Sequence, residues 1–317
     1  MFMRRVRFGA AAASAAALGS RRWLCDSQSS SSSSSSSSEL HSHSLPGGRV
    51  IVSLPPSYAA DLRANRPLDV VYVLDGHSKG LLASVVADAA RDDHAAVVGV
   101  KGRQWHPSLI VAGIVSTSPD GLARRPDALL EFVTEWAVPC VDAAYKTKPY
   151  AAGRAVCGFD ASGGAAVRRL LLEDDDRAKR FRFYLVGPDG LSSSDTVPMA
   201  ASTEAPLPQK TQVYLSGAGG RREAAEAFAD ALTNRGSSSA TDTTMFVNRH
   251  GEQTYSRHDA SAAAPFVTVD VPDALGTAVE QQPMDAFAIR GMRWLGEQLE
   301  RQKHASLGSL LPWHEFK

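Results

Sequence analysis

Residues 154–164 read RAVCGFDASGG. The run that starts at Arg154 and ends at Cys157 is apolar after its first residue and has the length of a short buried strand. Glycines then stand on both sides of the next four residues, which is typical of a sharp turn. Two consecutive glycines open the segment that follows, whose apolar spacing is helical through residue 172. The stretch therefore predicts one strand–turn–helix unit, the building block of an α/β fold.

The same alternation continues on both sides of this unit. Short apolar runs predict strands at 49–54, 70–74, 95–100, 182–186, 212–215 and 266–271, with a further strand at 243–247 inside a polar excursion that spans 236–265. Apolar residues at helical spacing predict helices at 79–91, 128–141, 223–232 and 284–302. The order predicts a three-layer α/β domain with a mostly parallel central sheet over residues 48–303, followed by a short tail at 304–317.

The first 47 residues have a different composition. They are rich in arginine and small residues, carry no acid before Asp26, and continue into an unbroken serine run. This composition is typical of an organelle transit peptide followed by a low-complexity linker. We therefore expect a mitochondrial protein, with a secretory signal as the alternative because residues 8–18 form a short apolar stretch. Eleven residues are too few to cross a bilayer, so no membrane span is expected.

The overall charge and the cysteines exclude several classes of function. Lysine plus arginine equals aspartate plus glutamate, at 34 each, which predicts no nucleic-acid partner. Cys25, Cys140 and Cys157 are too few and too widely spaced for a disulfide framework or a metal site. His41 and His43 flank the serine run and are taken as part of the linker, so no metal or cofactor is expected.

Several segments together resemble the esterase D and enterochelin-esterase branch of the α/β-hydrolases. They are RVIVSLPPSY at 49–58, PLDVVYVLDG at 67–76, VVGVKGR at 97–103, ALLEFVTEWAVPCVDAAYKT at 128–147, RAVCGFDASGG at 154–164 and FVTVDVPDALGTAV at 266–279. The resemblance implies the α/β-hydrolase fold and places residues 154–164 at the nucleophile elbow. An active member needs a serine there, in G-x-S-x-G, followed along the chain by an acid and a histidine.

Neither way of aligning the elbow puts a serine at the nucleophile position. Counting forward from Gly158 gives Asp160, and counting back from the glycine pair at 163–164 gives Ala161. Three interpretations stay open. In the first, Asp160 occupies a turn position with positive φ, and Ser162 caps the helix. In the second, Ser162 is a shifted nucleophile. In the third, the carboxylate of Asp160 is the nucleophile.

The other two members of the triad are also in doubt. The resemblance places Leu275 at the position of the histidine, and leucine cannot carry a proton. His250 and His258, in the polar excursion, are the remaining histidines between the elbow and the last helix. Glu223 is the nearest acid after the strand at 212–215, although an acid there also suits the start of a helix.

Backbone donors for an oxyanion hole would survive the loss of catalytic side chains. The resemblance places them at Gly76, His77 and Ala161. The sequence therefore predicts an esterase-like protein that has lost catalysis, a pseudo-esterase that serves as a binding or scaffold subunit of a mitochondrial protein complex. The alternative is an active carboxylic-ester hydrolase that uses Asp160 or Ser162 as an atypical nucleophile.

Overall fold

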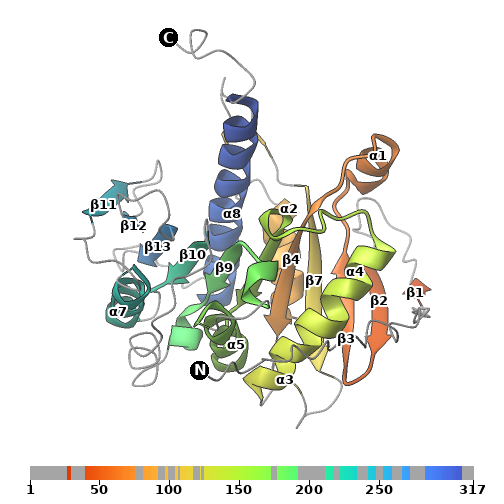
Figure 1. Cartoon of the computed structure of the whole chain (residues 1–317), viewed down its shortest axis with the longest axis horizontal. Coiled ribbons are helices and arrows are strands. Elements are labelled where there is room, and N and C mark those ends of the chain that lie inside the picture. Colours follow the sequence, from red (N-terminus) through yellow and green to blue (C-terminus); the bar gives the residue numbers. More distant parts are fainter. Residues whose placement is uncertain are drawn as a thin grey trace, which may run out of the picture.

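A single large sheet organises the protein (Figure 1). The computed structural model describes residues 27–29, 40–75, 81–91, 97–98, 104–105, 108–116, 122, 125–172, 177–191, 211–217, 221–233, 242–247, 253–258, 266–271 and 283–308. Within these residues the strands of the sheet lie in the order β1-β2-β3-β7-β4-β8-β9-β10-β13-β12-β11.

The middle of the sheet is parallel and its two margins are antiparallel. Parallel pairing joins β7 (Leu109–Ser116), β4 (Asp69–Asp75), β8 (Arg154–Gly158), β9 (Phe183–Val186), β10 (Gln212–Ser216) and β13 (Phe266–Val271). Antiparallel pairing adds β3 (Gly48–Ser53), β2 (Leu40–Leu45) and β1 (Ser27–Ser29) at one margin, and β12 (Gln253–His258) and β11 (Asp242–Val247) at the other. The carboxyl ends of the parallel strands therefore share one edge, where α/β proteins place their sites.

Helices cover both faces of this sheet, which confirms the three-layer prediction (Figure 1). One face packs against α3 (Pro126–Glu131), α4 (Val138–Ala144), α5 (Ala161–Leu172) and α7 (Arg222–Thr233). The other packs against α2 (Leu81–Arg91) and α8 (Pro283–Gly308). Alternate residues of each central strand enter the two cores; Tyr72 and Leu74 face α3 to α5, whereas Val71 and Val73 face α2 and α8.

The strand predicted at 95–100 is present at residues 97–98, the described part of that run, but it does not belong to the large sheet. Val97–Val98 (β5) pairs with Gln104–Trp105 (β6) in a separate two-stranded sheet. The place between β3 and β4 belongs to β7, whose first seven residues are all buried. A strand buried on both faces carries no alternation of apolar and polar residues, so the run LIVAGIVS offers no period-2 signal.

Both margins of the sheet extend beyond the expected domain core. The polar excursion contains the expected strand β11 and also β12, and together they continue the sheet from β13. At the other margin, β2 begins at Leu40 and pairs along its whole length with β3. The folded domain thus includes residues on the amino-terminal side of residue 48, the boundary predicted from composition. The remaining expected strands and helices are confirmed to within a few residues at their ends.

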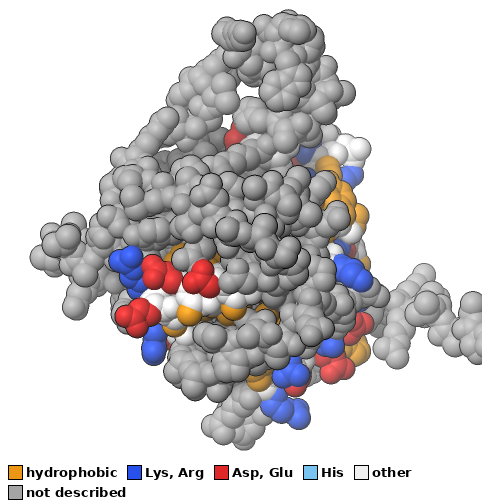
Figure 2. Space-filling model, turned by 60° about the vertical axis from the view of Figure 1, so that its left-hand side comes forward, with side chains coloured by type: hydrophobic (Ala, Val, Ile, Leu, Met, Phe, Trp, Pro, Cys, Tyr) orange, Lys and Arg blue, Asp and Glu red, His pale blue; other side chains and the backbone are white. Residues whose placement is uncertain are grey.

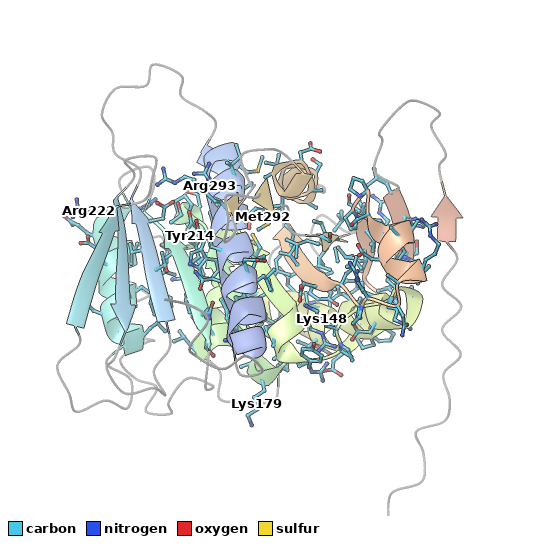
Figure 3. All side chains as sticks on the ribbon, turned by 90° about the horizontal axis from the view of Figure 1, so that it is seen from above. Lys148, Lys179, Tyr214, Arg222, Met292 and Arg293 are labelled. Atoms are coloured by element: carbon cyan, nitrogen blue, oxygen red, sulfur yellow. The ribbon has the colours of Figure 1, made fainter. Side chains whose placement is uncertain are left out.

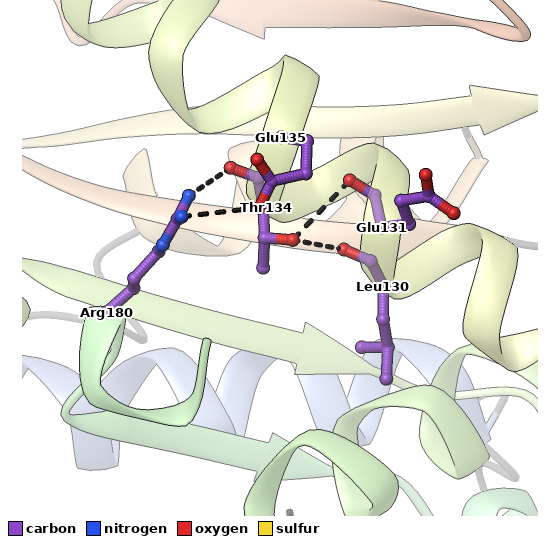
Figure 4. Close-up of polar contacts among 5 residues, drawn as sticks. All are labelled: Leu130, Glu131, Thr134, Glu135 and Arg180. Carbon is purple, nitrogen blue, oxygen red and sulfur yellow. Dashed lines mark hydrogen bonds and ion pairs between the residues drawn. The ribbon is translucent and has the colours of Figure 1, made fainter. Parts of the chain in front are cut away.

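The helix expected at 128–141 contains a π-helical turn, Phe132–Ala137, between α3 and α4 (Figure 4). Pro139 has no N–H, so it cannot donate a hydrogen bond to the preceding turn of the helix. One backbone carbonyl of that turn therefore needs a donor from elsewhere in the protein. Arg180 supplies this donor, because its guanidinium donates to the carbonyl of Thr134. It also donates to the carboxylate of Glu135 at 3.2 Å. The hydroxyl of the fully buried Thr134 donates in turn to the carbonyl of Leu130 at 2.9 Å.

The surface agrees with the balanced charge of the sequence. On the face shown in Figure 2, acidic and basic side chains adjoin one another among the described residues. On α7, for example, Arg222 donates to Glu226 at 2.9 Å. No helix in the described part of the chain is both long enough and apolar enough to cross a membrane.

Candidate functional site

The turn after β8 is an N-capped helix start. The Oδ1 atom of Asp160 accepts a hydrogen bond from the backbone N–H of Gly163 at 2.5 Å. The carbonyl of Asp160 accepts from the N–H of Gly164 at 2.8 Å, the first bond of helix α5. Asp160 is therefore the N-cap residue, one of the side chains best suited to satisfy the free N–H groups of a first turn.

The backbone of this turn lacks the strain of a nucleophile elbow. Among the described residues, Asn65 is the only one other than glycine with positive φ, at 56°, and Gly47 is the only such glycine. A catalytic elbow instead holds its nucleophile on a sharp, strained turn. The interpretation that gave Asp160 a positive φ and made Ser162 the cap was wrong in both details. Asp160 performs the capping, and a cap residue takes an ordinary negative φ.

Close backbone contacts explain the glycines around the turn. A Cβ atom on Gly158 would lie 2.3 Å from the carbonyl of Gly163, and one on Gly163 would lie 2.2 Å from the carbonyl oxygen of Leu74. A Cβ atom on Gly164 would lie 2.4 Å from the Cα atom of Gly190. These glycines let α5 approach β4, β8 and the 3₁₀ turn Pro188–Leu191 at backbone distance.

The other residues of the turn differ in their exposure. Ser162, the second residue of α5, is only 8% exposed, whereas Ala161 is exposed. The other two residues expected to line an oxyanion hole, Gly76 and His77, lie outside the described residues, as does Leu275. In the described part of the turn, the structure thus presents a helix cap and a buried hydroxyl at the carboxyl edge of the sheet.

The structure describes the candidate acid and one of the two candidate histidines. Glu223 is exposed in the first turn of α7. His258 ends β12, and because Arg257 pairs with Val267 near the start of β13, it lies toward the amino edge of the parallel strands. Four strand spacings separate β12 from β8, about 19 Å at the usual 4.8 Å per strand. The backbone of His258 is therefore far from Asp160, whereas His250 lies outside the described residues.

A buried ion pair that the sequence did not predict lies near the carboxyl ends of β10 and β13. Asp270 of β13 is 3% exposed and accepts from the Nε atom of Arg290 at 2.6 Å, with a second, bidentate contact from Nη2. The hydroxyl of Tyr214, in β10, also donates to Asp270. In Figure 3, Tyr214 lies beside α8, the helix that carries Met292 and also supplies Arg290. A charged residue within the apolar run FVTVDV was the signal for this contact.

This network joins the two strands after which an active hydrolase would carry its acid and its histidine. The backbone N–H of Gly217, just after β10, donates to the carbonyl of Asp270 at 2.7 Å. Trp294 of α8 donates to the hydroxyl of Thr268, also on β13, at 3.1 Å. The network holds β10, β13 and α8 together.

Across the described residues, no group of three or more histidine, cysteine, aspartate or glutamate side chains is placed to hold a metal ion.

The capping role of Asp160 predicts a specific pattern of stability. Replacement by alanine removes the cap and is expected to lower the free energy of unfolding by about 1 kcal/mol. Replacement by asparagine keeps an oxygen acceptor and is expected to cost only a few tenths of that value. Urea unfolding followed by circular dichroism measures both variants. Equal losses for Asp160→Ala and Asp160→Asn would contradict the assignment.

Comparison with known proteins gives one family match. Residues 45–174 match the family described as "Putative esterase". They begin at the end of β2 and finish just after α5, and so include the turn at Asp160. None of the curated proteins matches the chain in sequence.

Three solved structures illustrate the structural likeness. An uncharacterised protein from Capnocytophaga ochracea is 13% identical, with 82% of this chain and 65% of that chain covered and a TM-score of 0.49. An enterobactin esterase from Shigella flexneri is 12% identical, with 80% and 56% covered and a TM-score of 0.48. An esterase from Pyrobaculum calidifontis is 13% identical, with 84% and 85% covered and a TM-score of 0.48.

The chain spans less than two thirds of the length of the first two of these proteins. The strand order and the helical layers described above define its architecture independently of them. Residues 45–174 are similar to this family of esterases, and the mostly parallel sheet with helices on both faces fits an α/β-hydrolase fold.

Proposed function

We propose that this esterase-like protein does not hydrolyse esters and instead acts by binding, as a scaffold or binding subunit in the mitochondrion. The observation that carries the proposal is the hydrogen bond from the N–H of Gly163 to the carboxylate of Asp160. A nucleophile must present a lone pair to the substrate, whereas Oδ1 is directed to the helix it caps and Oδ2 is buried. The fold supplies the framework of an esterase, and function must be argued from the site.

The positions of the other groups support the same proposal. Ester hydrolysis through a carboxylate or a hydroxyl needs a base within hydrogen-bond reach, at about 3 Å. His258 ends its strand about four strand spacings from β8. The sequence resemblance places Leu275 at the position where a histidine is expected after β13. Ser162 lies within α5 and is buried, where an attacking hydroxyl needs access to its substrate. Binding requires none of these groups.

A hydrolysis assay tests this proposal against the alternative of an active ester hydrolase. The purified chain, Asp160→Asn and Ser162→Ala are compared on p-nitrophenyl acetate over a range of substrate concentrations. Asparagine keeps the helix cap while removing the carboxylate nucleophile, so a lost activity could not be ascribed to unfolding. We expect the same non-saturating background rate for all three proteins. Saturation kinetics that disappear in one variant would establish the alternative and name its nucleophile.

The mitochondrial part of the proposal rests on the arginine-rich, serine-rich composition of residues 1–47. The full chain with a carboxyl-terminal tag is expected to co-localise with a mitochondrial marker. Native electrophoresis of the mitochondrial extract is expected to show it above the mass of the free chain, in a stoichiometric complex. Recovery of the protein from the culture medium would favour the secretory alternative, and migration as a free chain would contradict the scaffold role.

A further inference from the structure

Strand β2 is attached to the body of the protein by a cluster of four aromatic side chains. His41 and His43 stand two residues apart on β2 and so point to the same face of the sheet. They meet Tyr145, which follows α4, and Tyr58, which begins α1 (Tyr58–Arg63). We call these four residues the His43 cluster. The cluster attaches the margin of the sheet formed by β2 to the segments around α1 and α4.

Tyr145 is at the centre of the His43 cluster. The rings of His41, His43 and Tyr58 all meet it edge-on, with centroids 5.8, 5.6 and 6.2 Å from its own. The Nε2 atom of His43 is hydrogen-bonded to the hydroxyl of Tyr145 at 2.7 Å. Leu45, the next residue on this face of β2, packs against the core beneath α3 and α4. The cluster therefore continues the main core to the edge of the sheet.

The surroundings of His43 suit a neutral imidazole and not a charged one. It is 3% exposed, and its Nδ1 atom is buried with no hydrogen-bond partner among the described residues. In the tautomer whose Nε2–H donates to the hydroxyl of Tyr145, a neutral ring leaves only an uncharged acceptor at Nδ1. A protonated ring carries an N–H on both nitrogens, so one donor and a full charge would remain buried and uncompensated.

The charged groups near the cluster do not offset this cost. His41 adds positive charge from the same strand. From the segment after α4, Lys146 donates its backbone N–H to the hydroxyl of Tyr58 and its Nζ atom to Asn65. Asp142 of α4 is held by Arg154 and Thr147. From β3, the residues paired with His43 and His41 are Val50 and Val52.

We propose that the His43 cluster is an acid-sensitive latch, in which protonation of His43 releases β2 from the sheet. Release would take β1 with it, because β1 pairs with β2 and not with β3. It would also leave the outer edge of β3 unpaired, and an unpaired edge can accept another strand. The latch thus couples the attachment of the amino-terminal margin to pH.

The direction of the coupling follows from the pKa of His43. Burial, and secondarily the charge of His41, hold that pKa below its usual value of 6.5. The released imidazole has the higher pKa, so the released state binds more protons than the latched state. The latch is therefore fully effective above about pH 6.5 and weakens as the pH falls through the window below that value.

Hydrogen exchange of the full chain, followed by mass spectrometry from pH 8 to pH 5, tests the latch. Protection factors remove the pH dependence of chemical exchange. The ratio of latched to released β2 is expected to fall by up to about tenfold per pH unit below 6.5. Protection of β8, in the middle of the sheet, is expected to stay constant over the same range.

Three variants make the assignment specific. His43→Gln keeps an acceptor for Tyr145 and His43→Phe keeps an aromatic ring, and neither titrates, so protection of β2 should no longer depend on pH. His41→Gln keeps His43 and should retain a pH dependence. Constant protection of β2 in the wild-type chain would overturn the proposal. An equal fall in β8, or an unchanged pH dependence in both His43 variants, would do so as well.

Discussion

Asp270→Asn is expected to lower the free energy of unfolding by about 3–5 kcal/mol, the usual cost of removing one partner of a buried ion pair. The side chains of Asp270 and Arg290 are only 5% and 14% exposed. The substitution would remove the charged carboxylate that faces the buried guanidinium, and the asparagine could not accept the same bidentate contact. Because the network joins β10, β13 and α8, we expect the whole domain to lose stability.

Urea unfolding measures this loss of stability, which is compared with the losses for two other variants. The exposed pair Arg222–Glu226 on α7 provides the control, because Glu226→Gln is expected to cost no more than about 0.5 kcal/mol. The double variant Asp270→Leu with Arg290→Met removes both charges and should be more stable than Asp270→Asn. A loss for Asp270→Asn as small as that for Glu226→Gln would show that the buried pair does not stabilise the fold.

Gly163→Ala is expected to cost about 3 kcal/mol, although alanine is the better helix former by about 1 kcal/mol. The new methyl group would lie 2.2 Å from the backbone oxygen of Leu74, so β4 and α5 would have to move apart. Gly291→Ala in α8 is the matched control. Its methyl group would meet the end of the flexible Leu185 side chain at 3.0 Å.

The two glycine variants are compared by their urea midpoints. We expect Gly163→Ala to unfold at a clearly lower concentration than the wild type, and Gly291→Ala to stay near it. If helix propensity alone determined the stability of both variants, their urea midpoints would change by the same amount. That result would refute the backbone contact between α5 and β4 as the reason for Gly163.

The sequence predicted the elements of the fold where periodicity was clear. The unit at 154–172 appears as β8 and α5, and the amphipathic run after Arg221 appears as α7. The uniformly apolar β7 was missed, because a strand buried on both faces has no polar positions to mark it. β2 was taken as linker because its serines and histidines do not look like a core strand, yet His43 is buried against Tyr145.

At the candidate site, the sequence identified the right turn but left the role of Asp160 open. Aspartate serves equally as a positive-φ residue, a nucleophile and a helix cap, and the choice depends on where its carboxylate points. The partners of Asp270 were not predictable because Tyr214 and Arg290 lie 56 and 20 residues away. Such pairs are determined by strand order and by the docking of α8, which one sequence does not encode in any local pattern.

We propose that the turn at 158–164, which caps helix α5, does not attack esters. Incubation of the full chain with an aryl ester, followed by peptide mass spectrometry, tests it most directly, with an active serine esterase as the control. We predict no acyl adduct on the peptide that carries Asp160 and Ser162, under conditions that label the control. An acyl group on either residue would show that the turn carries a nucleophile and would contradict the proposed loss of ester hydrolysis.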